Sequence, residues 1–162
     1  MDNEQSTKEY NELIFLDILK LLRTKQSRLA RKIIYHAYID YKFNNKLEVF
    51  NDEQIKMNAD LLKGDFDEIG FLIEFNYINK FHFFSLYSDV VRRVWISLEE
   101  EIKKERNLRK NTNLNSNKTD IFLEYFEKLA DYAKNFRDQK GLSEPLFTDY
   151  RNSLTHDVHK LR

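Results

Sequence analysis

Apolar residues recur at intervals of three and four along most of the chain, and this spacing predicts helices rather than strands. A first helix is expected at Ser6–Glu9, which has the Ser-x-x-Glu pattern of a capping box, and it continues through the apolar run Leu13–Leu22. Apolar side chains occur nearly all round this segment, as in a helix that is buried in a core or paired with a partner. The central core helix is the commoner of these two cases, and it is the one that we expect.

Two more helices are expected before residue 75. A break at 24–27 leads into a second helix, which ends in a loop at 44–45. Its apolar stripe consists of Ala30, Ile33, Ile34, Ala37, Tyr38 and Tyr41. A third helix starts near Asp52, and its apolar residues step 4-3-4-3-4 like a heptad seam that could pack within the chain or between chains. Gly64 and Gly70 lie along this seam, and either one indicates a kink or a close crossing of two helices.

Residues 76–80 indicate a turn, and 81–86 indicate a short aromatic-rich segment before a helix capped by Ser88 or Asp89. The buried stripe of that helix consists of Val91, Val94, Trp95, Leu98 and Ile102. Its opposite face is charged and is expected to be solvated, because acidic and basic residues alternate along it. That face consists of Arg92, Arg93, Glu99, Glu100, Lys103 and Lys104.

The Asn-rich segment at 110–119 indicates a flexible loop, after which Thr119 or Asp120 caps another helix. Gly141 is expected to end that helix, and Ser143–Pro145 to begin a last one. Together these elements predict an all-α fold, a single compact bundle of six or seven mostly antiparallel helices in one domain over residues 1–162. The residues expected to be buried are Leu62, Phe66, Ile69, Ile73, Val91, Trp95, Leu98, Phe122, Phe126 and Leu129.

The amino-acid composition excludes several classes of function but does not identify the function of the chain. An aromatic share of 14% argues against disorder, and the absence of cysteine excludes disulfides, thiolate catalysis and cysteine-ligated metals. Lys plus Arg and Asp plus Glu both number 27, so the chain lacks the basic excess of a typical duplex-binding protein. Phosphate-loop, zinc-protease and nucleophile-elbow motifs are missing, so no metal and no cofactor is expected. Without a membrane segment or secretory signal, we expect a soluble, cytoplasmic protein.

A basic stretch with no acidic residue runs from Lys20 to Lys32. Its candidate binding residues are Arg23, Lys25, Arg28, Arg31 and Lys32. Such a segment could bind phosphates or an acidic partner, and it could equally form the polar faces of two helices.

The sharpest local signal lies close to the carboxyl end, where Arg151 and Asn152 are followed by His156. The segment RNSLTH resembles the Arg-polar-x-x-x-His signature of HEPN-domain ribonucleases, all-helical proteins often found as toxins or anti-phage effectors. The resemblance implies metal-independent cleavage of RNA by a homodimer. In that case His156 would act as general acid or base for attack by the RNA 2′-hydroxyl, Arg151 would neutralise charge on the phosphate, and Asn152 would orient the site.

A second resemblance covers residues 14–137. The segments 30–35, 66–73, 90–102 and 125–130 are similar in order, spacing and residue type to a bacterial family of small all-helical domains of unknown function. That similarity implies the helical fold and supplies no catalytic residue. Many members of the family carry an amino-terminal membrane segment, and this chain departs from them with a charged amino terminus.

Besides nucleic-acid or phosphate binding by the basic stretch at Lys20–Lys32, two functional interpretations remain open. The leading one is a non-catalytic, cytoplasmic interaction or regulatory protein, linked to mobile elements or phage defence, which acts through a helical surface or by self-association. The alternative is a HEPN-like, metal-independent endoribonuclease that works as a homodimer and takes RNA as its substrate. Only the alternative uses Arg151, Asn152 and His156 as catalytic residues.

Overall fold

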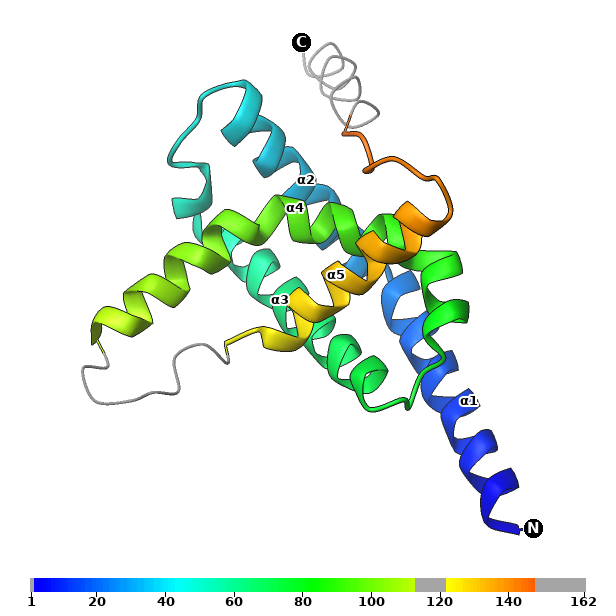
Figure 1. The fold of residues 1–162 in the computed structure, drawn as a ribbon. Coiled ribbons are helices and arrows are strands. Elements are labelled where there is room, and N and C mark those ends of the chain that lie inside the picture. Colours follow the sequence, from blue (N-terminus) through cyan, green and yellow to red (C-terminus); the bar gives the residue numbers. More distant parts are fainter. Residues whose placement is uncertain (1, 113–121, 148–162) are drawn as a thin grey trace.

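The computed structural model describes residues 2–112 and 122–147, and helices account for most of both ranges (Figure 1). The elements are α1 (Asp2–Arg23), α2 (Lys25–Phe43), the 3-10 helix η1 (Val49–Asn51), α3 (Glu53–Glu74), α4 (Lys80–Thr112) and α5 (Glu124–Gln139). The all-α class is therefore confirmed, and the described residues contain no strand. They form five α-helices, so the expected number of six or seven is not confirmed.

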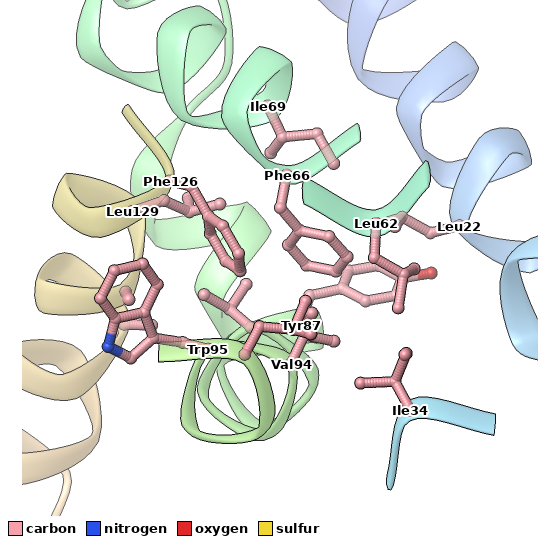
Figure 2. Packing of buried hydrophobic residues seen from close by; sticks show 14 of the residues in the cluster. Leu22, Ile34, Leu62, Phe66, Ile69, Tyr87, Val94, Trp95, Phe126 and Leu129 are labelled. Carbon is pink, nitrogen blue, oxygen red and sulfur yellow. The ribbon is translucent and has the colours of Figure 1, made fainter. Parts of the chain in front are cut away.

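The core lies where α3 packs against α2 and α5, and α4 closes it from the other side (Figure 2). Contacts between large rings join the helices. The Trp95 and Phe126 ring centroids are 5.0 Å apart in an edge contact, and those of Phe66 and Phe126 are 5.5 Å apart with the rings tilted. Nine of the ten residues expected in the core are buried. Phe122 is the exception, since it is half-buried and packs on the edge of the cluster.

The heptad-like seam of α3 packs within the chain. Five residues of the seam are buried, and Ile55 is half-buried. The buried ones are Ala59, Leu62, Phe66, Ile69 and Ile73. Gly70 marks a close crossing, because a Cβ at this position would lie 2.1 Å from the backbone oxygen of Tyr125 at the start of α5. At Gly64 no atom lies within 4 Å of the position of a Cβ, so a larger residue would fit here without a steric clash.

The helix start near Asp52 and the helix end at Gly141 are confirmed, whereas the break expected at 24–27 is limited to Thr24, because α2 begins at Lys25. Thr24 caps α2 by accepting from the Ser27 backbone N–H at 3.1 Å, and Asp52 caps α3 by accepting from that of Ile55 at 3.0 Å. At the end of α5, Gly141 has a φ of 66°. The backbone N–H groups of Gly141 and Leu142 donate to the carbonyls of Asp138 and Arg137, which is the Schellman pattern of a helix end.

The expected break between an aromatic segment at 81–86 and a helix capped at Ser88 or Asp89 is wrong. Residues 80–112 form one helix, α4, whose start is capped by the Asn79 side chain accepting from the His82 backbone N–H at 3.0 Å. Ser88 is a buried residue inside this helix. The polar pair resembled a cap in sequence, although the apolar stripe continues without interruption on both sides of it.

The solvated-face interpretation of α4 is wrong at Arg92. This side chain is buried, and its guanidinium donates to both carboxylate oxygens of Glu144 at 2.7–3.1 Å. Glu99 and Lys103 form an ion pair at the surface, as suits a solvated face, with their charged atoms 2.6 Å apart. Glu100 instead pairs with Lys42 of α2, so one end of the charged face holds two helices together.

The expected helix start at Ser143–Pro145 is also wrong. Residues 142–147 form a non-helical strap that crosses the bundle. Its Glu144 carboxylate accepts hydrogen bonds from Arg92, and its Pro145 is buried. The strap ends with the Phe147 ring 4.7 Å from Tyr38 and 5.8 Å from Tyr35. Residues 110–112 of the expected Asn-rich loop belong to α4, and 113–119 lie outside the described residues.

Candidate interaction surface on the amino-terminal helix

Helix α1 is attached to the bundle by its carboxyl-terminal half and extends away from it at the other end (Figure 1). Ile18 and Leu22 are buried and join the core cluster, in which Figure 2 labels Leu22. Among residues 7–13, every side chain except Asn11 is exposed. The expectation of a central core helix is therefore wrong, because only half of the apolar surface of α1 reaches the bundle.

Within α1, the large apolar residues that remain exposed lie on the outer side of the helix. Tyr10 and Leu13 are each 60% exposed, and Leu16 is 49% exposed. Residues three apart on a helix lie on neighbouring parts of its surface, so the three side chains form one continuous strip. An exposed apolar strip of this kind is typical of a surface that is covered in an assembly.

Charge is distributed unevenly along the same helix. The first eleven residues of α1 contain Asp2, Glu4, Glu9 and Glu12 with a single base, Lys8. The second half contains one acid, Asp17, together with Lys20 and Arg23. This polarity suits the helix dipole and gives the projecting end a negative charge.

The basic stretch of the sequence divides into structural and exposed residues. Arg31 is half-buried, and its guanidinium donates to the Leu22 carbonyl and the Ser27 hydroxyl, both at 2.8 Å. The Leu22 carbonyl is among the last of α1, so Arg31 closes the end of that helix and fixes the corner between α1 and α2. Arg23 is exposed and its Nε donates to the Tyr87 hydroxyl of α4 at 3.3 Å.

Lys25, Arg28 and Lys32 are exposed on α2 and have no ion-pair partner among the residues that the structure describes. Their spacing of three and four places them on one face of the helix. With Arg23 they form what we call the basic corner, which lies at the end of α1 opposite to its acidic turns. Four of the five candidate binding residues are therefore available at the surface, and Arg31 is a structural residue.

A groove of about 700 Å³ lies on the inner side of α1, between its projecting half and the first turn of α4. Phe15, Ile78 and Phe81 line it with several amide side chains. The Asn11 Oδ1 is buried there and accepts no hydrogen bond within the described residues. The groove separates the projecting half of α1 from the first turn of α4, so the bundle does not pack closely against this side of α1 either.

Two half-buried carboxylates, Asp65 and Asp67, lie on α3. Burial raises the pKa of Asp65, and the charge of Glu68 adds to this while that of Arg31 opposes it. Asp67 accepts from the Phe126 backbone N–H at 2.9 Å and so caps α5. Among the described residues no three His, Asp or Glu side chains gather as metal ligands do.

The catalytic residues of the alternative interpretation, Arg151, Asn152 and His156, lie outside the described residues. Searches of protein-family models, curated proteins and solved structures found no match to this chain. Within the described ranges, every helix is too short or too polar to cross a membrane.

Sequence reasoning missed the outer strip of α1 as a site, although the signal was present. An apolar pattern all round one helix, next to acidic turns, indicated either burial or a partner. The choice between these depended on how far the helix lies against the bundle, which periodicity alone does not encode.

Proposed function

We propose that this chain is a non-catalytic interaction protein of the cytoplasm and that its docking surface is α1. The single observation that carries the proposal is the exposed apolar strip of Tyr10, Leu13 and Leu16 on a helix that leaves the bundle. A helix with no partner on this side would expose two leucines and a tyrosine at no benefit to folding. The rigid bundle would hold the strip, because Leu22 and Arg31 fix the carboxyl end of α1.

The proposal is supported by the chemistry around the strip. Acidic turns lie at one end of α1 and the basic corner at the other, so a partner would be oriented by charge as well as held by apolar contact. Interaction surfaces commonly combine a small apolar centre with a charged rim of this kind.

A photo-crosslinking amino acid at position 13 tests the proposal in intact cells. We expect a discrete crosslinked product from Leu13, and we expect the additional substitution Leu16→Lys to remove it. The matched control carries the same crosslinker at Leu47, which is 71% exposed and lies in the loop after α2. Equal products from both positions, or none from Leu13, would contradict the proposal.

The alternative function, a HEPN-like ribonuclease, is proposed on the motif at 151–156. One observation favours it, because Phe147 packs on Tyr35 and Tyr38 and so brings the chain that leads to the motif against α2, which carries Arg28 and Lys32. Those bases would bind the phosphates of RNA. Expression of the wild type and His156→Ala in parallel tests it, since only the wild type should degrade host RNA and arrest growth. Equal RNA integrity would exclude it.

A further inference from the structure

We propose that the partner of α1 is α1 of a second copy of this chain, paired antiparallel about a two-fold axis between Ile14 and Phe15. This inference rests on the proposed function, because it names the occupant of the same surface. It depends on three features of α1: the spacing of its outer residues, the distribution of its charges and the place where the bundle begins.

The spacing of the outer residues is that of a helix-pairing seam. Glu9, Leu13, Leu16 and Lys20 follow one another in steps of 4-3-4. Steps of four and three keep side chains along one line of a helix, as at the a and d positions of a coiled coil. All four residues are exposed, and Tyr10 flanks them. Within one copy the Lys20 Nζ also pairs with the exposed Asp17 Oδ1 at 2.9 Å, so Glu9 of the second copy would join an existing ion pair. The outer surface of α1 therefore has an apolar centre with a carboxylate at one end and an ammonium at the other.

This seam is complementary to itself only in the antiparallel orientation. A two-fold axis between Ile14 and Phe15 places residues opposite each other when their numbers add up to 29. Leu13 then faces Leu16 of the second copy, and Glu9 faces its Lys20. A parallel pair would bring Glu9 against Glu9 and Lys20 against Lys20, and like charges at such positions destabilise a pair.

The charges at the two ends of α1 favour the same orientation, whereas near the centre Glu12 lies level with Asp17 of the second copy. In the antiparallel pair the acidic turns of one α1 lie beside the carboxyl-terminal end of the other, where the basic corner begins. The two helix dipoles also run in opposite directions, so the positive end of each helix lies near the negative end of the other. The net charge of the chain is zero, so no long-range repulsion acts between the copies.

The position of the bundle leaves room for this arrangement. Contact between α1 and the bundle lies in the second half of a helix about 33 Å long, where Ile18 and Leu22 are buried and Ile14, Phe15, Leu19 and Leu21 pack against the core. Antiparallel pairing separates the two Leu22 positions by about 22 Å along the helix axis, so the bundles lie at opposite ends of the pair. A parallel pair would place both bundles side by side at the same end.

Sedimentation velocity over a range of concentrations, with charge-reversal variants of the full chain, tests the inference. The wild type should shift from 19.7 kDa toward twice that mass. Glu9→Lys and Lys20→Glu should each raise the dissociation constant of the dimer by about tenfold, since each variant places like charges together at two symmetric positions. The double variant Glu9→Lys/Lys20→Glu should recover the wild-type constant, because both opposite-charge pairs are formed again.

Lys8→Glu is the matched control. It changes the net charge as Lys20→Glu does, and it lies on the inner side of α1 at the groove. It should leave the dimer constant within about twofold of the wild type, and circular dichroism should show the same helix content in all variants. A double variant as weak as either single variant would overturn the antiparallel register.

A wild type that stays at 19.7 kDa at every concentration would overturn the inference. If the crosslinker at Leu13 then yields a product of some other mass, the proposed function holds while the second copy is excluded. If Leu13 yields no product, both fail. The two outcomes are therefore distinguishable.

Discussion

Replacing Gly70 by alanine should destabilise the bundle, although alanine is the better helix former. The added Cβ would lie 2.1 Å from the Tyr125 carbonyl oxygen and 2.5 Å from its carbon, so α3 and α5 must move apart by more than an ångström. Both atoms are backbone, and no side chain can rotate to relieve the contact. Overpacking of this kind costs up to about 3 kcal/mol, and the gain in helix propensity returns about 1 kcal/mol. We expect a net loss of about 2 kcal/mol.

Thermal unfolding measured by circular dichroism checks this magnitude. For a chain of this size a loss of about 2 kcal/mol lowers Tm by roughly 4–8 °C. Gly64→Ala is the matched control, because it lies in the same helix with nothing within 4 Å of the new Cβ. It should raise Tm by roughly 2–4 °C through helix propensity alone. Equal upward shifts in the two variants would refute the close crossing of α3 and α5.

Three further predictions concern polar groups around the core. The pKa of Asp65 is raised by burial, so its charged form opposes folding, and the stability associated with the protonated form is lost as pH rises through the folded-state pKa. Asp65→Asn should therefore raise Tm near neutral pH and lose this advantage toward about pH 4, and a pH-independent difference would contradict it. Glu144→Gln leaves the Arg92 guanidinium buried without a counter-charge and should cost about 1–2 kcal/mol in urea unfolding, more than Arg92→Met, which lets Glu144 turn to water. Asp67→Ala should cost about 1 kcal/mol by removing the cap on the Phe126 N–H, whereas Asp67→Asn, which keeps an acceptor, should cost less.

The helical core could be predicted from the sequence because its information is local and periodic. The stripe from Leu62 to Ile73 repeats at the helical period, and its members are buried in the structure. The same holds for caps whose partner lies three residues away, such as Asp52 with Ile55. Gly70 could be singled out as a close crossing or a kink, and only the position of Tyr125 decides between the two.

Features that depend on distant residues could not be predicted. Arg92 has the spacing of a solvated face, and its burial follows from Glu144, 52 residues away. The strap at 142–147 has the residues of a helix start, yet it is non-helical and is held in place by that ion pair and by the contact of Phe147 with Tyr38. For the same reason the apolar pattern of α1 did not reveal which of its sides the bundle leaves uncovered.

The most direct test of self-association through α1 is a distance between the two amino-terminal arms. The chain contains no cysteine, so Gln5→Cys, at an exposed position, can carry a single nitroxide label for double electron–electron resonance. The antiparallel register predicts a separation of about 30 Å between the two labelled backbones, from the rise of the helix and the usual spacing of paired helices. A parallel pair would bring them to about 10 Å, and a chain that does not pair would give no dipolar signal. Either of these results would contradict the account.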